Sequence, residues 1–213
     1  MKQNAIPDAT NDVAGRIAQE SLRRRGFGYA DEVRRLLDAA LEVMQRSGSS
    51  SRARVADIVA AAGLSNEAFY RHFPSKDALV AAVLEDGTER LKSYLAHQMA
   101  KQRTPAGKVR RWVEGIMSQA TPELAEATLA VLFNSGGVDA ALYSGRYPAS
   151  EPLAGLIHEP LAAIGSSRPE LDGLLFAHAV IGRLTDHLRA RTQPSRGELD
   201  HVVELCLRGV GKP

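Results

Sequence analysis

The sequence has a single cysteine and contains no long hydrophobic run. Cys206 alone cannot form an internal disulfide, so we expect a reducing compartment such as the cytoplasm. No stretch approaches the roughly 18 consecutive apolar residues that span a bilayer, and we therefore expect no membrane partner. The polar segment 1–15 lacks the apolar core of a secretory signal, which also favours a cytoplasmic protein.

The motifs of several common enzyme classes are also missing. The chain contains no Gly-x-Ser-x-Gly elbow, no Walker phosphate-binding loop and no His-Glu-x-x-His pair. Its six histidines show no convincing metal spacing, and one cysteine excludes a structural zinc cluster of cysteines. We therefore predict a protein that is not an enzyme and that uses no metal or other cofactor.

Neither sign of charge predominates in the sequence, since the formal net charge is only +2. Residues 1–76 carry 12 Lys and Arg against 9 Asp and Glu, whereas residues 77–213 carry 15 against 16. This small basic surplus permits binding to nucleic acid, but ordinary solvated charge explains it equally well. Aromatic residues make up 5% of the sequence, which is few for a cavity that binds many different drugs.

The sequence does contain apolar residues at intervals of three and four throughout, without the alternation typical of strands. This pattern predicts an all-α fold. Residues 1–30 are interpreted as a flexible, basic N-terminal extension, at most loosely helical, and residues 135–150 as a loop rich in glycine and proline. The expected helices cover residues 31–46, 54–62 and 65–73, a long stretch from Ser75 past Leu95, and then 105–119, 122–134, 152–164, 169–191 and 196–209.

Two of these helices are short and are separated by Gly63, Leu64 and Ser65, which predicts a helix-turn-helix. Glycine allows the left-handed residue that ends the first helix, leucine enters the small core, and serine can cap the second helix. Such a second helix fits the major groove of DNA while its predecessor braces the phosphate backbone. An ordinary surface helix would show the same pattern, with inward Ala68, Phe69 and Phe73, outward Asn66, Glu67, Tyr70 and Arg71, and His72 at the boundary.

A more specific signal follows in Phe69-Tyr-Arg-His-Phe-Pro-Ser-Lys-Asp-Ala-Leu79, preceded by Gly63-Leu-Ser65. This stretch resembles the signature of the TetR family of repressors. The match covers residues 31–85, about a quarter of the chain, and the remainder is similar in helical character only. The resemblance implies a three-helix DNA-binding domain over 31–76, joined by a fourth helix to a helical ligand-binding and dimerisation domain over 77–213.

The resemblance also implies roles for individual positions in this sequence. Tyr70 and Lys76 are expected to contact phosphates, often together with His72 and Ser65. Asn66 and Glu67 open the recognition helix and are expected to bind base edges, adenine and the cytosine amino group respectively. The expected DNA-binding set is Arg54, Ser65, Asn66, Glu67, Tyr70, Arg71, His72 and Lys76.

Some positions depart from the commonest pattern of the family. Glu67 stands where a small residue is frequent, Ala68 lacks a hydroxyl often found there, and Phe69 replaces a usual leucine. Glu67 could repel the DNA backbone unless it meets a base, or could simply be solvated. The arginines at 23–25 could form an arm in the minor groove, or an equally plausible basic tail without a defined contact.

For the C-terminal half, the resemblance implies a small-molecule cavity and a dimer interface formed by the last two helices. Two adjacent helices with long apolar faces agree with a homodimer, although the protomer's own core could also bury those faces. The expected interface residues are Leu174, Leu175, Ile181, Leu184, Leu188, Leu199, Val202, Val203 and Cys206. The expected ligand-binding residues, each of which could equally be plain core or surface, are Trp112, Met117, Phe133, Phe176 and His178.

Together these features predict a transcriptional repressor that binds double-stranded DNA at a palindromic operator as a homodimer and is released by a small-molecule effector. The alternative is a related regulator that acts as an activator or is controlled by a protein partner, without a small ligand.

Overall fold

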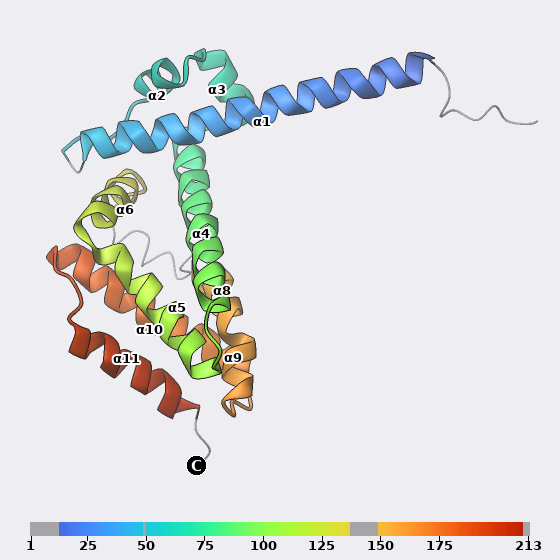
Figure 1. Ribbon diagram of the computed structural model, residues 1–213. Helices are drawn as coiled ribbons and strands as arrows, with labels where there is room; N and C mark the ends of the chain where they lie inside the picture. Colours follow the sequence, from blue (N-terminus) through green and yellow to red (C-terminus); the bar gives the residue numbers. More distant parts are fainter. Residues whose placement is uncertain (1–12, 49, 137–148, 211–213) are drawn as a thin grey trace, which may run out of the picture.

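The computed structural model describes residues 13–48, 50–136 and 149–210, and all regular elements among them are helical. Figure 1 shows α1 lying across one end of the molecule with α2 and α3 against it, while α4 runs from this end to the remaining helices. The predicted all-α fold is therefore confirmed. The elements are α1 (Val13–Ser47), α2 (Val55–Ala62), α3 (Asn66–His72), α4 (Lys76–Ala100), α5 (Pro105–Met117), the short 3-10 helix η1 (Ser118–Ala120), α6 (Pro122–Asn134), α8 (Ser150–Ala154), η2 (Gly155–Ile157), α9 (His158–Ala163), α10 (Pro169–Ala190) and α11 (Arg196–Gly209).

The first helix is longer than the sequence predicted, since it begins at Val13 rather than near Asp31. The segment 13–30 contains no proline, and most of its residues are good helix formers. Gly26 and Gly28 weaken a helix by about 1 kcal/mol each relative to alanine, which does not end one. The interpretation of 1–30 as an extension separate from the helix is thus wrong for 13–30, and residues 1–12 lie outside the described part.

Hydroxyl side chains begin several of the other helices. Ser65 and Ser75 each accept a hydrogen bond from the backbone amide three residues ahead, at 3.1 Å, as predicted. Thr104 and Ser195 cap α5 and α11 in the same way. These bonds satisfy amides that have no partner within the helix.

The helix predicted over 152–164 is broken into α8, η2 and α9, whereas 122–134 and 196–209 have the predicted bounds. Pro152 and Pro160 lie within the first turn of α8 and α9 respectively, where a proline needs no amide partner. The segment 135–150, predicted as a loop, lies mostly outside the described residues.

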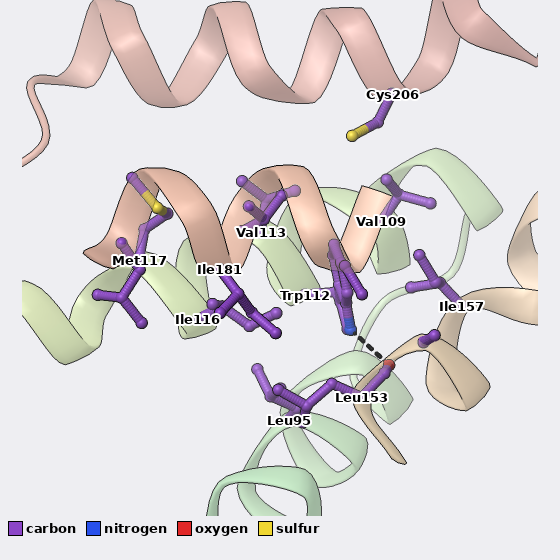
Figure 2. Packing of buried hydrophobic residues seen from close by; sticks show 14 of the residues in the cluster. Leu95, Val109, Trp112, Val113, Ile116, Met117, Leu153, Ile157, Ile181 and Cys206 are labelled. Carbon is purple, nitrogen blue, oxygen red and sulfur yellow. Dashed lines mark hydrogen bonds between the residues drawn. The ribbon is translucent and has the colours of Figure 1, made fainter. Parts of the chain in front are cut away.

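Two hydrophobic clusters form the cores of the molecule. The first joins α1, α2, α3 and the start of α4 around Leu36, Ile58, Phe69 and Leu79, which are fully buried. The second lies among α4, α5, α8, η2, α9, α10 and α11, and Figure 2 shows Trp112 at its centre. Each cluster belongs to one end of the long helix α4, which therefore links the two.

Helix α6 belongs to both ends of the molecule. Its Ala130 and Val131 are buried in the cluster of α1 and α2, while its Leu129 and Leu132 pack against the other cluster. At its last residue, the Asn134 side-chain oxygen accepts a hydrogen bond from the backbone amide of Ala53, 2.9 Å away, just before α2. A second element besides α4 therefore connects the helix-turn-helix to the rest of the chain.

None of the described helices is long and apolar enough to cross a membrane.

Candidate nucleic-acid interface and ligand cavity

The turn between α2 and α3 has the geometry that the sequence predicted. Gly63 ends α2 in the left-handed conformation with φ +62°, and Leu64 packs against the core cluster. The guanidinium of Arg35, on α1, donates to the carbonyl oxygens of Ala62 and Gly63 at 2.5 and 3.2 Å. These carbonyls end a helix and lack intrahelical partners, so Arg35 holds α2 against α1 at the turn.

Helix α3 turns one face inward and leaves the other exposed. Ala68, Phe69 and Phe73 are buried, which confirms the predicted inward set. The opposite face carries Asn66 and Glu67 at the N-terminal end, and Tyr70 follows one turn later with 58% of its surface exposed. The exposed face therefore offers amide, carboxylate and phenol groups on a short, firmly anchored helix.

The C-terminal end of α3 is tied to α1. His72 lies 2.6 Å from the Glu32 carboxylate through Nε2, and its side chain is only 9% exposed. The Tyr29 ring packs edge-on against His72, with 5.4 Å between ring centroids. The hydrogen bond with His72, and secondly the charge of Arg71, hold the pKa of Glu32 below its ordinary value. His72 thus positions the helix, and the structure does not leave it open for a phosphate as predicted.

The remaining members of the predicted DNA-binding set lie around α3. Arg71 is exposed but is shared between Glu32, at 3.4 Å, and Glu67, at 4.0 Å. Arg54 precedes α2 and pairs with Asp57 at 2.9 Å, and this bond raises the pKa of the guanidinium. Lys76 opens α4 and is half-buried.

A cavity of about 750 Å³ lies between the two ends of the molecule. Its walls come from α1, α4, η1, α6 and α10, with single contributions from α5 and α8. Most of the lining side chains are aliphatic, among them Leu41, Leu91, Leu132, Ile181 and Leu188. Because α1 forms part of the wall, an occupant would touch the helix that carries Glu32 and Arg35.

None of the five predicted ligand-binding residues lines this cavity. Trp112 and Met117 are fully buried core residues, and the Trp112 indole donates to the Leu153 carbonyl at 2.9 Å (Figure 2). Phe133 and Phe176 are half-buried elsewhere, and His178 is exposed. Trp112 fills the core instead of the cavity, because a large aromatic side chain buries the most apolar area there.

The predicted dimer residues divide into two groups. Ile181, Leu184, Leu188, Val203 and Cys206 are buried in the protomer's own core, so a partner cannot reach them. Leu174, Leu199 and Val202 are half-buried against that core. Only Leu175 is exposed, to 55%. The inner faces of α10 and α11 pack against the protomer's own core, and this corrects the interface prediction for the five buried residues.

Sequence reasoning missed both the Glu32–His72 tie and the cavity wall on α1. The tie joins residues 40 positions apart, and no pattern marked it. The sequence does contain a signal for the cavity wall, because the apolar face of α1 is broader than one core needs. Leu36, Ala40 and Met44 are fully buried, whereas Leu37 and Leu41 are half-buried and line the cavity.

Comparisons with known proteins agree with this geometry. Residues 36–83 match the family model of the bacterial regulatory proteins of the TetR family. No curated protein matches the chain.

Among solved structures, a TetR-family transcriptional regulator from Streptomyces coelicolor is 22% identical, with a TM-score of 0.59 over 85% of this chain and 91% of that one. The fatty acid degradation regulator FadR from Bacillus halodurans is 20% identical, with a TM-score of 0.58 over 83% and 94%. RolR, in complex with resorcinol, is 18% identical, with a TM-score of 0.61 over 87% and 90%. The resemblance is confirmed: this chain carries the N-terminal domain of the TetR family of bacterial regulatory proteins within the fold that these structures share.

Proposed function

We propose that the protein is a transcriptional repressor that binds a palindromic operator as a homodimer and is released by a small-molecule effector. The observation that carries the proposal is the exposed face of α3, whose polar groups stand on a helix anchored by Phe69, Phe73 and the Glu32–His72 tie. A short rigid helix with free hydrogen-bonding groups at its N-terminal end fits the major groove.

Within this proposal, the side chains of α3 and its neighbours divide the work. Asn66 and Glu67 bind base edges, because they are exposed at the N-terminal end of the recognition helix. Tyr70, Lys76 and Arg54 contact phosphates, and Ser65 keeps the helix end capped. Arg71 and His72 act mainly by holding α3 to α1, which departs from the initial prediction for these two residues.

The two recognition helices are held in register by a homodimer through the outer faces of α10 and α11. Leu171, Leu175 and Leu205 are 48%, 55% and 57% exposed on these helices, more than most leucines in the chain. Exposed apolar side chains of this size mark interaction surfaces when they cluster. An outer-face interface also agrees with the burial of the inner faces in the protomer.

The effector binds in the cavity between α1, α4, α6 and α10. RolR was solved with resorcinol bound, which supports a small molecule as the effector of this fold. Because α6 lines the cavity and is hydrogen-bonded to Ala53 just before α2, an occupant that displaces α6 shifts the helix-turn-helix directly. Two half-sites must lie about one helical turn apart, so a small shift breaks the register.

Selection of bound fragments from random duplex DNA tests the proposal, and a palindrome is the expected result. On the selected duplex, Lys76→Ala weakens binding to all sequences and lowers the salt dependence by about one ion, whereas the exposed Lys101→Ala at the other end of α4 is the matched control. Asn66→Ala relaxes preference at particular base pairs by about 1–3 kcal/mol. A monomer that ignores duplex DNA at low salt would refute the proposal.

A further inference from the structure

The serine and threonine hydroxyl groups on the cavity wall already have partners, whereas the phenol of Tyr94, at the exposed edge, has none among the described residues. Thr88 and Thr128 donate to the carbonyls of Leu84 and Leu124 at 2.9 and 3.0 Å, each within its own helix. Thr185 and Ser118 likewise donate to backbone carbonyls at 2.8 Å. The hydrogens of these groups are engaged, so the wall offers few donors to an acceptor on a ligand.

The charged groups on the wall pair with one another and leave one carboxylate in excess. Arg90, on α4, lies 3.3 Å from Asp38 on α1 and 2.7 Å from Asp86 on its own helix. A ligand carboxylate would therefore meet a guanidinium that already serves two carboxylates. The three side chains are 38–61% exposed, so they sit at a mouth where solvent screens them, and the rest of the wall would desolvate an ion without compensation.

Beside these charged groups, the exposed edge of the cavity also carries an aromatic ring and a leucine. Tyr94 and Leu124 line the cavity, yet they are 49% and 42% exposed. Apolar side chains at both the wall and the mouth favour a ligand that buries hydrocarbon. The volume, about 750 Å³, lies within the usual range for sites that enclose a drug-sized molecule.

One half-buried lining residue has a side-chain amide without a partner. Gln119, in η1 between α5 and α6, is half-buried, and its side chain makes no hydrogen bond with the described part of the chain. Gln45 also lacks a partner there, but it is exposed. A half-buried amide without a partner gains the most from a hydrogen bond with a bound molecule, because it is already partly desolvated.

We propose that the cavity binds an uncharged, hydrocarbon-rich molecule with a single polar group that hydrogen-bonds with Gln119. This inference rests on the proposed function and names the chemical class of its effector. A neutral hydroxyl both donates to the Gln119 carbonyl oxygen and accepts from its amide, whereas a carboxylate repels that oxygen and meets no free cation on the wall.

The test uses the full-length protein and three probes with the same ten-carbon chain, namely decanol, decanoate and decylammonium, in calorimetric titrations at neutral pH. Decanol is expected to bind at least about tenfold more tightly than either ion, which corresponds to about 1.4 kcal/mol. Equal or tighter binding of decanoate would overturn the inference, as would equal or tighter binding of decylammonium.

Variants connect the binding to this cavity. Gln119→Leu is expected to weaken decanol binding about tenfold, and the exposed Gln193→Leu is the matched control. Ala127→Trp fills the cavity and abolishes binding, whereas Ala96→Trp on the outside of α4 retains it. Circular dichroism confirms that each variant is folded, and unchanged binding in Gln119→Leu contradicts the assignment.

Binding of the selected duplex by the same preparations keeps the two proposals distinguishable. A protein that binds its duplex but no decanol disproves the ligand class and leaves the proposed DNA-binding function standing. A protein that binds decanol but no duplex disproves the function and leaves the cavity as a site for neutral apolar molecules.

Discussion

The hydrogen bond between Asn134 and Ala53 provides a direct test of how the two ends of the molecule are coupled. The Asn134 side chain is 98% buried, since only 2% is exposed, and its oxygen accepts from the Ala53 amide at 2.9 Å. Its amide also donates to the Ala130 carbonyl at 2.9 Å. Asn134→Ala therefore leaves a buried backbone donor just before α2 without a partner.

The size of the effect follows from this burial. An unpaired buried donor costs about 1–3 kcal/mol, whereas a hydrogen bond lost to solvent costs little. The matched control is Ser135→Ala, because the Ser135 hydroxyl donates only to the Leu132 carbonyl at the end of α6 and the residue is less buried. We expect Asn134→Ala to lower the free energy of unfolding by about 2 kcal/mol, and Ser135→Ala to change it by less than about 0.5 kcal/mol.

Urea unfolding followed by circular dichroism, at one fixed protein concentration, measures the difference. For a chain of this length, the same change lowers the melting temperature by about 4–8 °C. Duplex binding with and without decanol then shows whether the bond carries coupling, since a ligand that weakens DNA binding must be weakened equally by DNA. If Asn134→Ala matches Ser135→Ala in both measurements, α6 does not couple the cavity to the helix-turn-helix.

Three further perturbations test the local structure. The hydrogen bond with His72 holds the pKa of Glu32 below its ordinary value of 4.5, so the ionised carboxylate stabilises the folded state above that pH, and the stabilisation is lost as pH falls through the lowered pKa. An acid titration of Glu32→Gln should lack this component, and an unchanged profile contradicts the tie. Gly63→Ala places a methyl group 3.0 Å from an Arg35 nitrogen, in a residue with φ +62°. A non-glycine residue in the left-handed conformation costs about 1–2 kcal/mol, so the melting temperature should fall by several degrees. An unaltered melting temperature would show that the turn relaxes. Burial raises the pKa of the Cys206 thiol to about 11, so a thiol reagent should label the native protein far more slowly than the unfolded one. The free energy of unfolding should also fall as pH rises from 9 towards 11. Rapid labelling of the native protein would refute the burial.

Local signals explain why so much of the fold could be predicted. The helix-turn-helix depends on Gly63, Ser65 and a run of apolar residues close together in the chain, and each of these acts within a few residues. Prolines at the starts of α5, α6 and α10 mark those boundaries for the same reason. Helix α1 begins earlier than the sequence predicts, because glycine weakens a helix without ending it.

The predicted ligand-binding and dimer residues of the C-terminal half agree less well with the structure. An apolar residue on a helix can face its own core, a cavity or a partner, and its spacing is the same in all three cases. Leu188 and Leu175 both have interface-like spacing on α10, yet the first is buried in the protomer and the second is exposed. Trp112 was a reasonable candidate for a ligand contact, but its indole is engaged with the Leu153 carbonyl.

The sequence by itself determined that the chain is helical, where the recognition helix begins and which of its side chains face outward, because those properties follow from hydrogen bonds and periodicity within a few turns. Only the tertiary structure decided that His72 is tied to Glu32, that α6 reaches the helix-turn-helix through Asn134, and that α1 helps to enclose a cavity. These contacts join residues 40 to 81 positions apart. They depend on how the helices pack against one another, which no local pattern encodes.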